Sequence, residues 1–144
     1  MPDVQRRYPP CPLVGVGILI VEGENILLAK RENDPGKGRW SIPGGLLELG
    51  EPVRDGAKRE AKEETGIDVE IEDLLDVIDN IIRDEEGKVC YHYVLVDFLG
   101  HPVGGQLQPG TDVKEAMWAS IRELDTLNTT RTLKRLVEKA KLLK

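Results

Sequence analysis

The amino-acid sequence predicts one domain of the α/β class, on three observations. Apolar, β-branched runs of strand length occur in both halves of the chain. Two segments with helical spacing of apolar residues are interleaved with these runs. The chain has 144 residues, of which 40% are hydrophobic and 32% charged, as in one ordinary globular domain. Because no repeat, low-complexity segment or linker divides it, we assign residues 1–144 to a single domain.

The N-terminal part is expected to form short strands joined by turns. The first two strands flank Glu22-Gly23-Glu24, which has the composition of a hairpin turn. The third strand follows a turn-rich segment and is expected to end at Pro43-Gly44-Gly45. The predicted strands cover residues 14–21, 25–30 and 40–42.

A helix is expected from Pro52 to the residue before Gly66. Proline is favoured in the first turn of a helix, and glycine readily adopts the left-handed conformation that ends one. Val53, Ala57 and Ala61 recur every four residues and form the packing face.

The C-terminal half is expected to contain two long strands, a short strand and a closing helix. We predict strands at 69–82, 89–99 and 115–119, a Gly/Pro loop at 102–111, and helices opening at Ser120 and covering 133–143. In the second long strand, alternation places Tyr91, Tyr93, Leu95 and Asp97 on one face.

Charge and length exclude several classes of function. The formal net charge of −6 argues against a protein that binds nucleic acid through its phosphates. The apolar run at 13–21 is too short to span a membrane and is followed by no signal cleavage site. Cys11 and Cys90 are too few for a disulfide framework, so we expect buried thiols in a cytoplasmic protein.

The strongest functional signal is a group of acids on one side of the predicted helix. At about 100° per residue, Glu60, Glu63 and Glu64 lie within an arc of about 100°. Such carboxylates repel one another unless a positive charge lies among them. Lys58, Arg59 and Lys62 pairing on a solvated face is one solution, and a hard divalent cation is the other.

The surrounding spacing distinguishes these alternatives. The matching positions are Gly45, Glu51, Arg59, Glu60, Glu63, Glu64, Gly66 and Ile67, with Ala61 in the remaining apolar position. They follow the pattern G-x5-E-x7-R-E-U-x-E-E-x-G-U, where U is apolar. The chain therefore resembles the Nudix hydrolases. This resemblance implies a mixed β-sheet between helices, an α/β/α sandwich.

The resemblance also implies an activity and a metal site. Nudix enzymes hydrolyse the pyrophosphate bond of a nucleoside diphosphate linked to another moiety, with Mg²⁺ or Mn²⁺. By motif position, Arg59 would orient the acids and Glu51 would brace the loop. The implied metal ligands are Glu60, Glu63, Glu64 and the carbonyl of Gly44 or Gly45.

The general base and the substrate contacts are less strongly specified. In some family members the general base is the first glutamate of the Arg-Glu pair, which is Glu60 here. In others the base comes from a distant loop or strand. Our first candidate for such a distant base is Glu115, and our second is Asp112. Arg31 and Arg39 lie before the glycines and are candidates for holding phosphate oxygens, and Trp40 is a candidate for stacking on a base.

The expected substrate is a small nucleotide. The segments 8–17 and 91–97 resemble small prokaryotic Nudix proteins named ADP-ribose pyrophosphatases, so ADP-ribose or a nucleotide sugar is the first candidate. Residues 81–84 contain neither the proline of an ADP-ribose subgroup nor the tyrosine of a dinucleoside polyphosphate subgroup. The alternatives are a (deoxy)nucleoside triphosphate pyrophosphohydrolase, a non-catalytic nucleotide-binding regulator, and an acidic helix that binds a partner. Homodimers are frequent among members of this family, so a homodimer is a further expectation from the resemblance.

Overall fold

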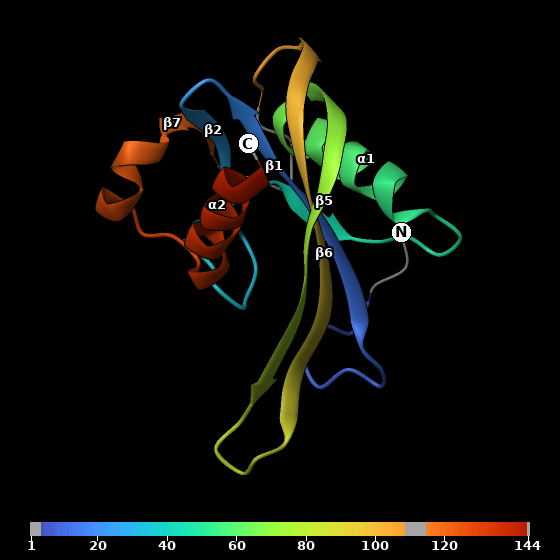
Figure 1. Cartoon of the computed structure of the whole chain (residues 1–144). Coiled ribbons are helices and arrows are strands. Elements are labelled where there is room, and N and C mark those ends of the chain that lie inside the picture. Colours follow the sequence, from blue (N-terminus) through green and yellow to red (C-terminus); the bar gives the residue numbers. More distant parts are fainter. Residues whose placement is uncertain (1–3, 109–114, 144) are drawn as a thin grey trace.

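The computed structural model describes residues 4–108 and 115–143. These residues form the elements shown in Figure 1. The strands are β1 (Leu13–Glu22), β2 (Asn25–Lys30), β3 (Trp40–Ser41), β4 (Gly44–Leu46), β5 (Ile67–Arg83), β6 (Val89–Gly105) and β7 (Ala116–Ser120). The helices are α1 (Val53–Thr65), the 3-10 helix η1 (Ile121–Thr126) and α2 (Arg131–Leu143).

The strands form one mixed sheet in the order β3-β2-β1-β6-β5, with β4 beside β1 and β7 beside β2. Strand β1 runs parallel to β6, and the other pairs are antiparallel. Residues 15–17 of β1 pair with β4, whereas residues 21–22 pair with β2. One strand therefore belongs to two branches of the sheet, which diverge along its length.

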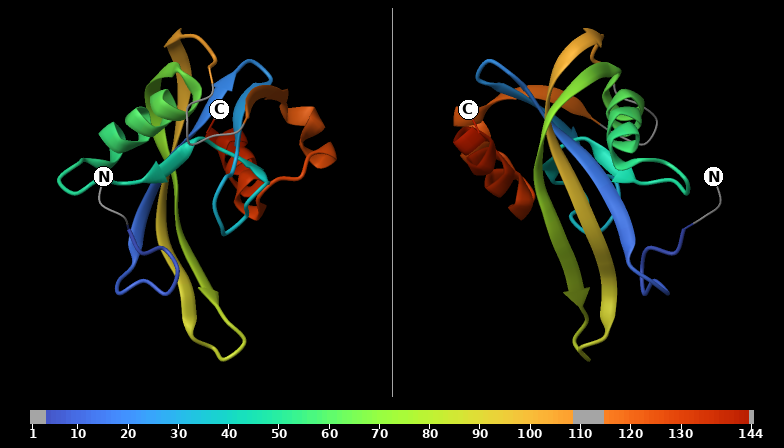
Figure 2. Two further views of the ribbon diagram at one scale, coloured as in Figure 1. Left: turned by 180° about the vertical axis from the view of Figure 1, so that it is seen from behind. Right: turned by 45° about the vertical axis from the view of Figure 1, so that its right-hand side comes forward.

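The two α-helices cover opposite faces of this sheet (Figure 2). Helix α1 buries Ala57 and Ala61 against a cluster that includes Ile18 and Phe98. Helix α2 packs on the other side in a second cluster. This arrangement confirms the predicted α/β class and the sandwich with a mixed sheet. No helix of the described residues has the length and apolar character needed to cross a membrane.

Helix α1 ends as the sequence predicts. Gly66 has φ 79°, and its N–H donates to the carbonyl of Lys62. The predicted hairpin is also present, with Val21 paired to Ile26.

Three local predictions are wrong. Gly44 and Gly45 do not end a strand but begin β4, since β1 supplies a pairing partner. Strand β6 continues through Pro102 to Gly105 where a loop was predicted, because shifts in register along β5 accommodate the proline. Cys11 is exposed, although Cys90 is buried as expected. The predicted short helix after Ser120 is present as a 3-10 helix, and the Ser120 hydroxyl accepts a hydrogen bond from the N–H of Arg122.

Candidate active site

Two glycines on β4 let helix α1 approach the sheet closely. A Cβ atom at position 44 would overlap the carbonyl oxygen of Val16 on β1. A Cβ atom at position 45 would overlap the carboxylate of Glu60 on α1. Any side chain at either position would therefore displace β1 or Glu60. Gly45 thus lets the Glu60 carboxylate lie against the backbone of β4, and Gly44 lets β4 lie close to β1.

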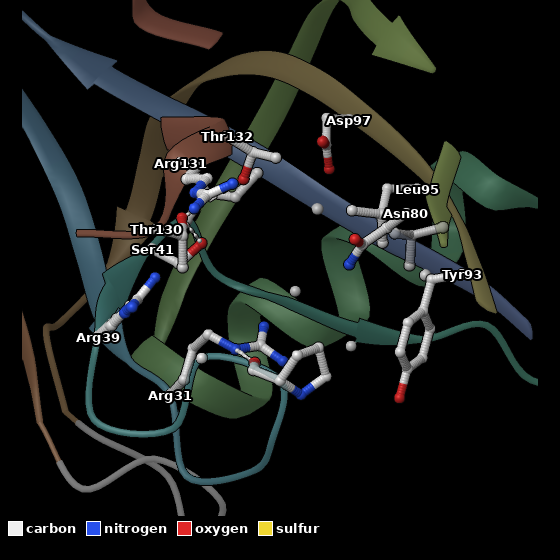
Figure 3. A pocket seen from close by; sticks show the side chains of 18 of the residues that line it. Arg31, Arg39, Ser41, Asn80, Tyr93, Leu95, Asp97, Thr130, Arg131 and Thr132 are labelled. Atoms are coloured by element: carbon white, nitrogen blue, oxygen red, sulfur yellow. Dashed lines mark hydrogen bonds between the residues drawn. The ribbon is translucent and has the colours of Figure 1, made fainter. Parts of the chain in front are cut away.

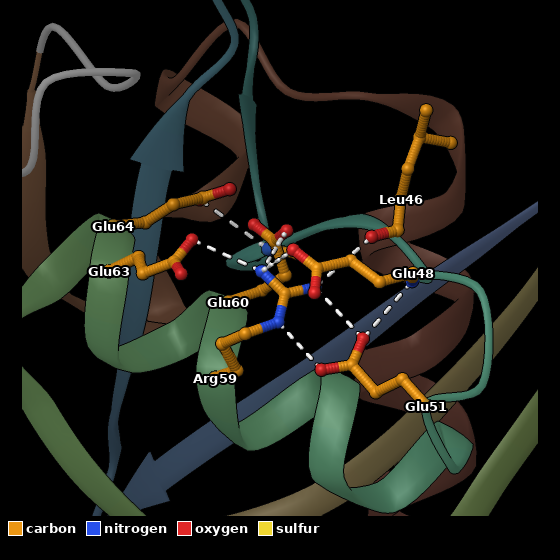
Figure 4. A network of polar contacts seen from close by, with 8 residues as sticks. Leu46, Glu48, Glu51, Arg59, Glu60, Glu63 and Glu64 are labelled. Carbon is orange, nitrogen blue, oxygen red and sulfur yellow. Dashed lines mark hydrogen bonds and ion pairs between the residues drawn. The ribbon is translucent and has the colours of Figure 1, made fainter. Parts of the chain in front are cut away.

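Arg59 lies at the centre of the acidic cluster (Figure 4). Its Nε and Nη2 donate to the two oxygens of Glu51, at 2.7 and 3.0 Å. Nη1 donates to Glu60 at 2.9 Å and to Glu63 at 3.1 Å. Nη2 also reaches the carbonyl oxygen of Leu46 at 3.2 Å. One guanidinium thus joins helix α1 to the loop before it and to strand β4.

Glu51 supports the loop as well as Arg59. Its Oε1 accepts a hydrogen bond from the backbone N–H of Glu48 at 3.1 Å. The hydrogen bonds from Arg59 lower the pKa of Glu51, and the same pair raises the pKa of Arg59. Both groups are therefore held in their charged forms, and the loop from β4 to α1 is fixed by a charge-assisted bidentate contact.

The remaining acids of the cluster lie next to the glycines. Oε2 of Glu64 is 3.4 Å from the backbone N–H of Gly44, which donates to it. Glu48 lies 3.8 Å from Arg59. Five carboxylates, those of Glu48, Glu51, Glu60, Glu63 and Glu64, thus surround or adjoin one guanidinium. The cluster retains excess negative charge.

The chemical type of the donor atoms in the cluster fits a hard divalent cation. All the side-chain donors are carboxylate oxygens, which Mg²⁺ and Mn²⁺ prefer. Within residues 4–108 and 115–143, no three Asp, Glu, His or Cys side chains converge closely enough to hold one ion. Glu60 and Glu63 instead share Nη1 of Arg59. The assignment of Glu60, Glu63, Glu64 and the glycine carbonyls as metal ligands stays a prediction.

A cavity of about 400 Å³ adjoins the cluster and is lined by both acidic and basic residues. Its acidic residues include Glu60, Glu63 and Glu64. Its basic residues, apart from Arg59, are Arg6, Lys30 and Arg31. A site with this charge arrangement suits a ligand that combines phosphate oxygens with bound cations.

A second cavity, of about 480 Å³, continues from the first on the α2 side of the sheet (Figure 3). The two share Arg6, Arg31, Gly44 and Gly45 among their lining residues. The polar residues that line only the second cavity are Arg39, Ser41, Asn80, Tyr93, Asp97, Thr130, Arg131 and Thr132. We call this space the α2-side cavity.

The predicted phosphate contacts lie at these cavities. Arg31 lines both, and its Nε donates to the carbonyl oxygen of Pro35 at 2.7 Å. Burial lowers the pKa of Arg31. Arg39 lines the α2-side cavity.

Two further candidates lie elsewhere. Trp40 lines neither cavity, and its ring packs against the α2-side core with Lys30 Nζ 5.7 Å from its centroid. Glu115 is exposed and lies 3.6 Å from Lys30, also outside both cavity linings. Asp112 falls outside the described residues.

Several cavity residues were not singled out from the sequence. Arg6 comes from the N-terminal segment, Asn80 from β5, Asp97 from β6 and Arg131 from α2. Asp97 alone carried a recognisable signal, because it is a charged residue within an otherwise apolar strand. Asp97 is in fact buried.

Comparison with known proteins identifies the class to which this fold and site belong. A sequence model described as the NUDIX domain matches residues 12–140. The chain therefore belongs to the Nudix hydrolase family.

Individual relatives are similar over most of the chain. An ADP-ribose pyrophosphatase of Methanocaldococcus jannaschii is 39% identical over 116 residues, which are 81% of this chain and 66% of the relative. The human 8-oxo-dGDP phosphatase NUDT18 is 30% identical over 95% of this chain but only 41% of its own length. The crystal structure of a MutT Nudix hydrolase from Burkholderia pseudomallei has a TM-score of 0.75 and 32% identity, covering 90% of this chain and 98% of that one. The chain thus spans two thirds or less of these two curated relatives.

Proposed function

We propose that this protein is a metal-dependent pyrophosphohydrolase that cleaves the diphosphate of a nucleoside diphosphate linked to another moiety. ADP-ribose or a nucleotide sugar is the preferred substrate class. The observation that carries the proposal is the acidic cluster around Arg59, which borders a cavity that basic residues also line. The 39% identity to an ADP-ribose pyrophosphatase supports the substrate class.

In this reaction water attacks one phosphorus atom and the bond from that phosphorus to the bridging oxygen breaks. The products are a nucleoside monophosphate and the phosphorylated second moiety. Glu60, Glu63 and Glu64, with the carbonyls of Gly44 and Gly45, would hold Mg²⁺ or Mn²⁺. The bound cations would neutralise phosphate charge and lower the pKa of the attacking water.

Residues of the chain position the base, accept the proton and bind the phosphates. Arg59 fixes the position of Glu60 through the 2.9 Å contact while Glu51 fixes Arg59. The carboxylate of Glu60 accepts the proton of the attacking water. Arg6 and Arg31 bind the phosphate oxygens at the passage between the two cavities.

Glu115 is the alternative base. Its ion pair with Lys30, which lines the site cavity, gives it an indirect link to the substrate. The kcat of Glu115→Gln on ADP-ribose separates the two assignments. If Glu60 is the base, this variant keeps kcat within about threefold; a loss of 100-fold or more transfers the role to Glu115.

The second candidate function is hydrolysis of a (deoxy)nucleoside triphosphate. The similarity of 53 residues, at 40% identity, to a Mus musculus protein named oxidized purine nucleoside triphosphate hydrolase favours it. Both candidates use the same cluster and differ in the second product, which is a sugar phosphate in the first case and pyrophosphate in the second. Steady-state kcat/KM on ADP-ribose, nucleotide sugars and ordinary and oxidised triphosphates, with Mg²⁺ or Mn²⁺, tests them. A 100-fold preference for a triphosphate would overturn the first choice, and no turnover on the whole panel would favour a nucleotide-binding regulator.

A further inference from the structure

Two buried polar side chains on β6 line the α2-side cavity without a hydrogen-bond partner among the described residues. Asp97 is 5% exposed, and no hydrogen-bond donor of the described residues reaches its carboxylate. Tyr93 is 6% exposed, and its hydroxyl likewise has no hydrogen-bond partner among those residues. Both line the cavity. Since buried polar groups are nearly always hydrogen-bonded, each needs an explanation.

The ionised form of Asp97 is disfavoured in the folded protein. A carboxylate removed from water without compensating hydrogen bonds is strongly disfavoured. Burial, with a smaller contribution from nearby Asp76, raises the pKa of Asp97 to about 7. An apolar residue at this position would avoid the cost. A carboxyl group at this position therefore points to a contact that is made when the cavity is filled.

The sheet keeps space for such a contact. The parallel register of β1 and β6 places Gly17 beside Asp97. A Cβ atom at position 17 would lie 2.9 Å from Oδ1 of Asp97 and 2.8 Å from Cδ1 of Ile42. A larger residue would thus press on the carboxyl group. On the other side of β6, Asn80 pairs with Tyr93 and adds an amide to the same wall.

The charges of the cavity are separated. In Figure 3, Arg31, Arg39 and Arg131 lie on one side, and Asp97 and Asn80 lie on the other. A phosphate is attracted to the arginine side and repelled by an ionised carboxyl group. The Asp97 side suits a neutral group that carries N–H or O–H donors, and Leu95 provides an apolar wall beside it.

We propose that Asp97 determines substrate specificity by accepting a hydrogen bond from an N–H or O–H group of the substrate moiety outside the diphosphate. The donor belongs to a nucleobase or to a sugar. Asn80 and the Tyr93 hydroxyl provide further contacts to the same moiety. This inference rests on the proposed function, because it places the non-reacting part of the nucleotide in the α2-side cavity.

The test pairs one substitution with matched substrate analogues. Wild-type protein, Asp97→Ala and the control Asp79→Asn are assayed on ADP-ribose and on two analogues, one lacking the exocyclic amine of the base and one lacking the 2′-hydroxyl of the adenosine ribose. Asp79 is an exposed β5 residue that lines neither cavity. In the wild type, the analogue that lacks the contacted donor should have a KM at least 10-fold higher. In Asp97→Ala that ratio should fall to about 1, with kcat changed less than threefold.

The outcomes separate the inference from the function on which it rests. Loss of discrimination for the amine analogue assigns a base donor, and loss for the hydroxyl analogue assigns a sugar donor. If the wild type turns over ADP-ribose but Asp97→Ala keeps every substrate ratio, the inference is wrong while the function stands. If the wild type turns over none of the substrates, the proposed function itself fails. Thermal unfolding without ligand should show Asp97→Ala folded, and a variant too unstable to assay would point to a structural role instead.

Discussion

The acidic cluster on α1 and the α2-side cavity differ in how their polar groups are satisfied. In the cluster, Arg59 contacts three carboxylates and a backbone carbonyl within one hydrogen-bonded network. In the cavity, Asp97 and Tyr93 have no partner from the described part of the chain. The cluster is therefore organised before any ligand binds, whereas under our proposal a ligand completes the hydrogen bonding of the cavity.

The two regions also differ in where their residues come from. The cluster is built from residues 44–64, on one strand, one loop and one helix. The cavity draws on β1, β5, β6, the loop after β2 and α2. A continuous segment can thus specify reaction chemistry, while the topology of the sheet assembles selectivity from distant segments.

The largest effect is expected from removing a carboxylate of the cluster. Glu64→Gln keeps the side-chain volume but removes a negative charge and an oxygen donor beside Gly44. We expect kcat to fall about 1,000-fold because charge neutralisation at the phosphates is lost. Circular dichroism should show normal folding. The control is Glu86→Gln, which removes an exposed acid in a turn and should leave kcat unchanged.

Substituting Arg59 should affect both stability and rate. Arg59→Ala leaves Glu51 and Glu60 without their shared donor. We expect the free energy of unfolding to fall by about 1–3 kcal/mol. This is less than the loss expected for a fully buried ion pair, because the Arg59 side chain is 22% exposed. The kcat should fall about 10- to 100-fold. Arg59→Lys should recover only part of the lost stability and part of the lost kcat, since lysine cannot form the bidentate contact. A lysine variant with the stability and kcat of the wild type would exclude an orienting role for Arg59.

The cavity should make stability depend on pH through Asp97. Its folded pKa of about 7 lies above the unfolded value of about 3.9, so the folded state retains a proton that the unfolded state loses. The stability of the wild type relative to Asp97→Asn should therefore be highest below pH 4 and fall as the pH rises towards 7. The expected change is about 4 kcal/mol between pH 4 and pH 9.

Urea unfolding of both proteins across this range measures the difference. Asp76 of β5 is ionised throughout most of this range, because Lys139 lowers its pKa. Arg39 and Arg131 lie on the far wall of the cavity. A difference between the two proteins that does not vary with pH would mean that Asp97 is not held as a buried, unpaired acid.

The smallest effect is expected at the N-terminal segment that serves both regions. Tyr8 has φ 50°, its hydroxyl donates to Asp84 at 2.6 Å, and its N–H donates to the carbonyl of Cys90 at 2.8 Å. These contacts fix the chain two residues after Arg6, which lines both cavities. Tyr8→Phe should raise KM about two- to fivefold with kcat unchanged, because Arg6 loses its fixed position.

Arg6→Ala should raise KM more, about 10-fold, and the double variant should resemble Arg6→Ala alone. Additive effects in the double variant would show that Tyr8 acts independently of Arg6.

The contrast between the regions also explains what the sequence could predict. The bounds of α1 follow from Pro52 and Gly66, and the acidic cluster follows from spacing within one helix. Strand β4 was missed because Gly44-Gly45 has the composition of a strand end, and only its pairing with β1 makes it a strand. Asp97 could be placed on a face of β6 by alternation, but its cavity depends on the register with β1 and on the position of α2.

The site candidates outside the cluster show the same limit. Arg31 and Arg39 precede the glycines in sequence and do line a cavity. Trp40 belongs to the same segment, yet its ring is packed with the α2-side core. Proximity in sequence could not decide between these outcomes, because β3 is two residues long and directs its side chains to different surroundings.

Metal removal tests the central claim most directly. Protein stripped with a chelator is mixed with ADP-ribose, and the products are followed by phosphorus NMR before and after addition of Mg²⁺ or Mn²⁺. We predict no turnover without metal, and formation of AMP and ribose 5-phosphate at a rate that saturates with added metal. Undiminished hydrolysis in the continued presence of chelator would contradict the account.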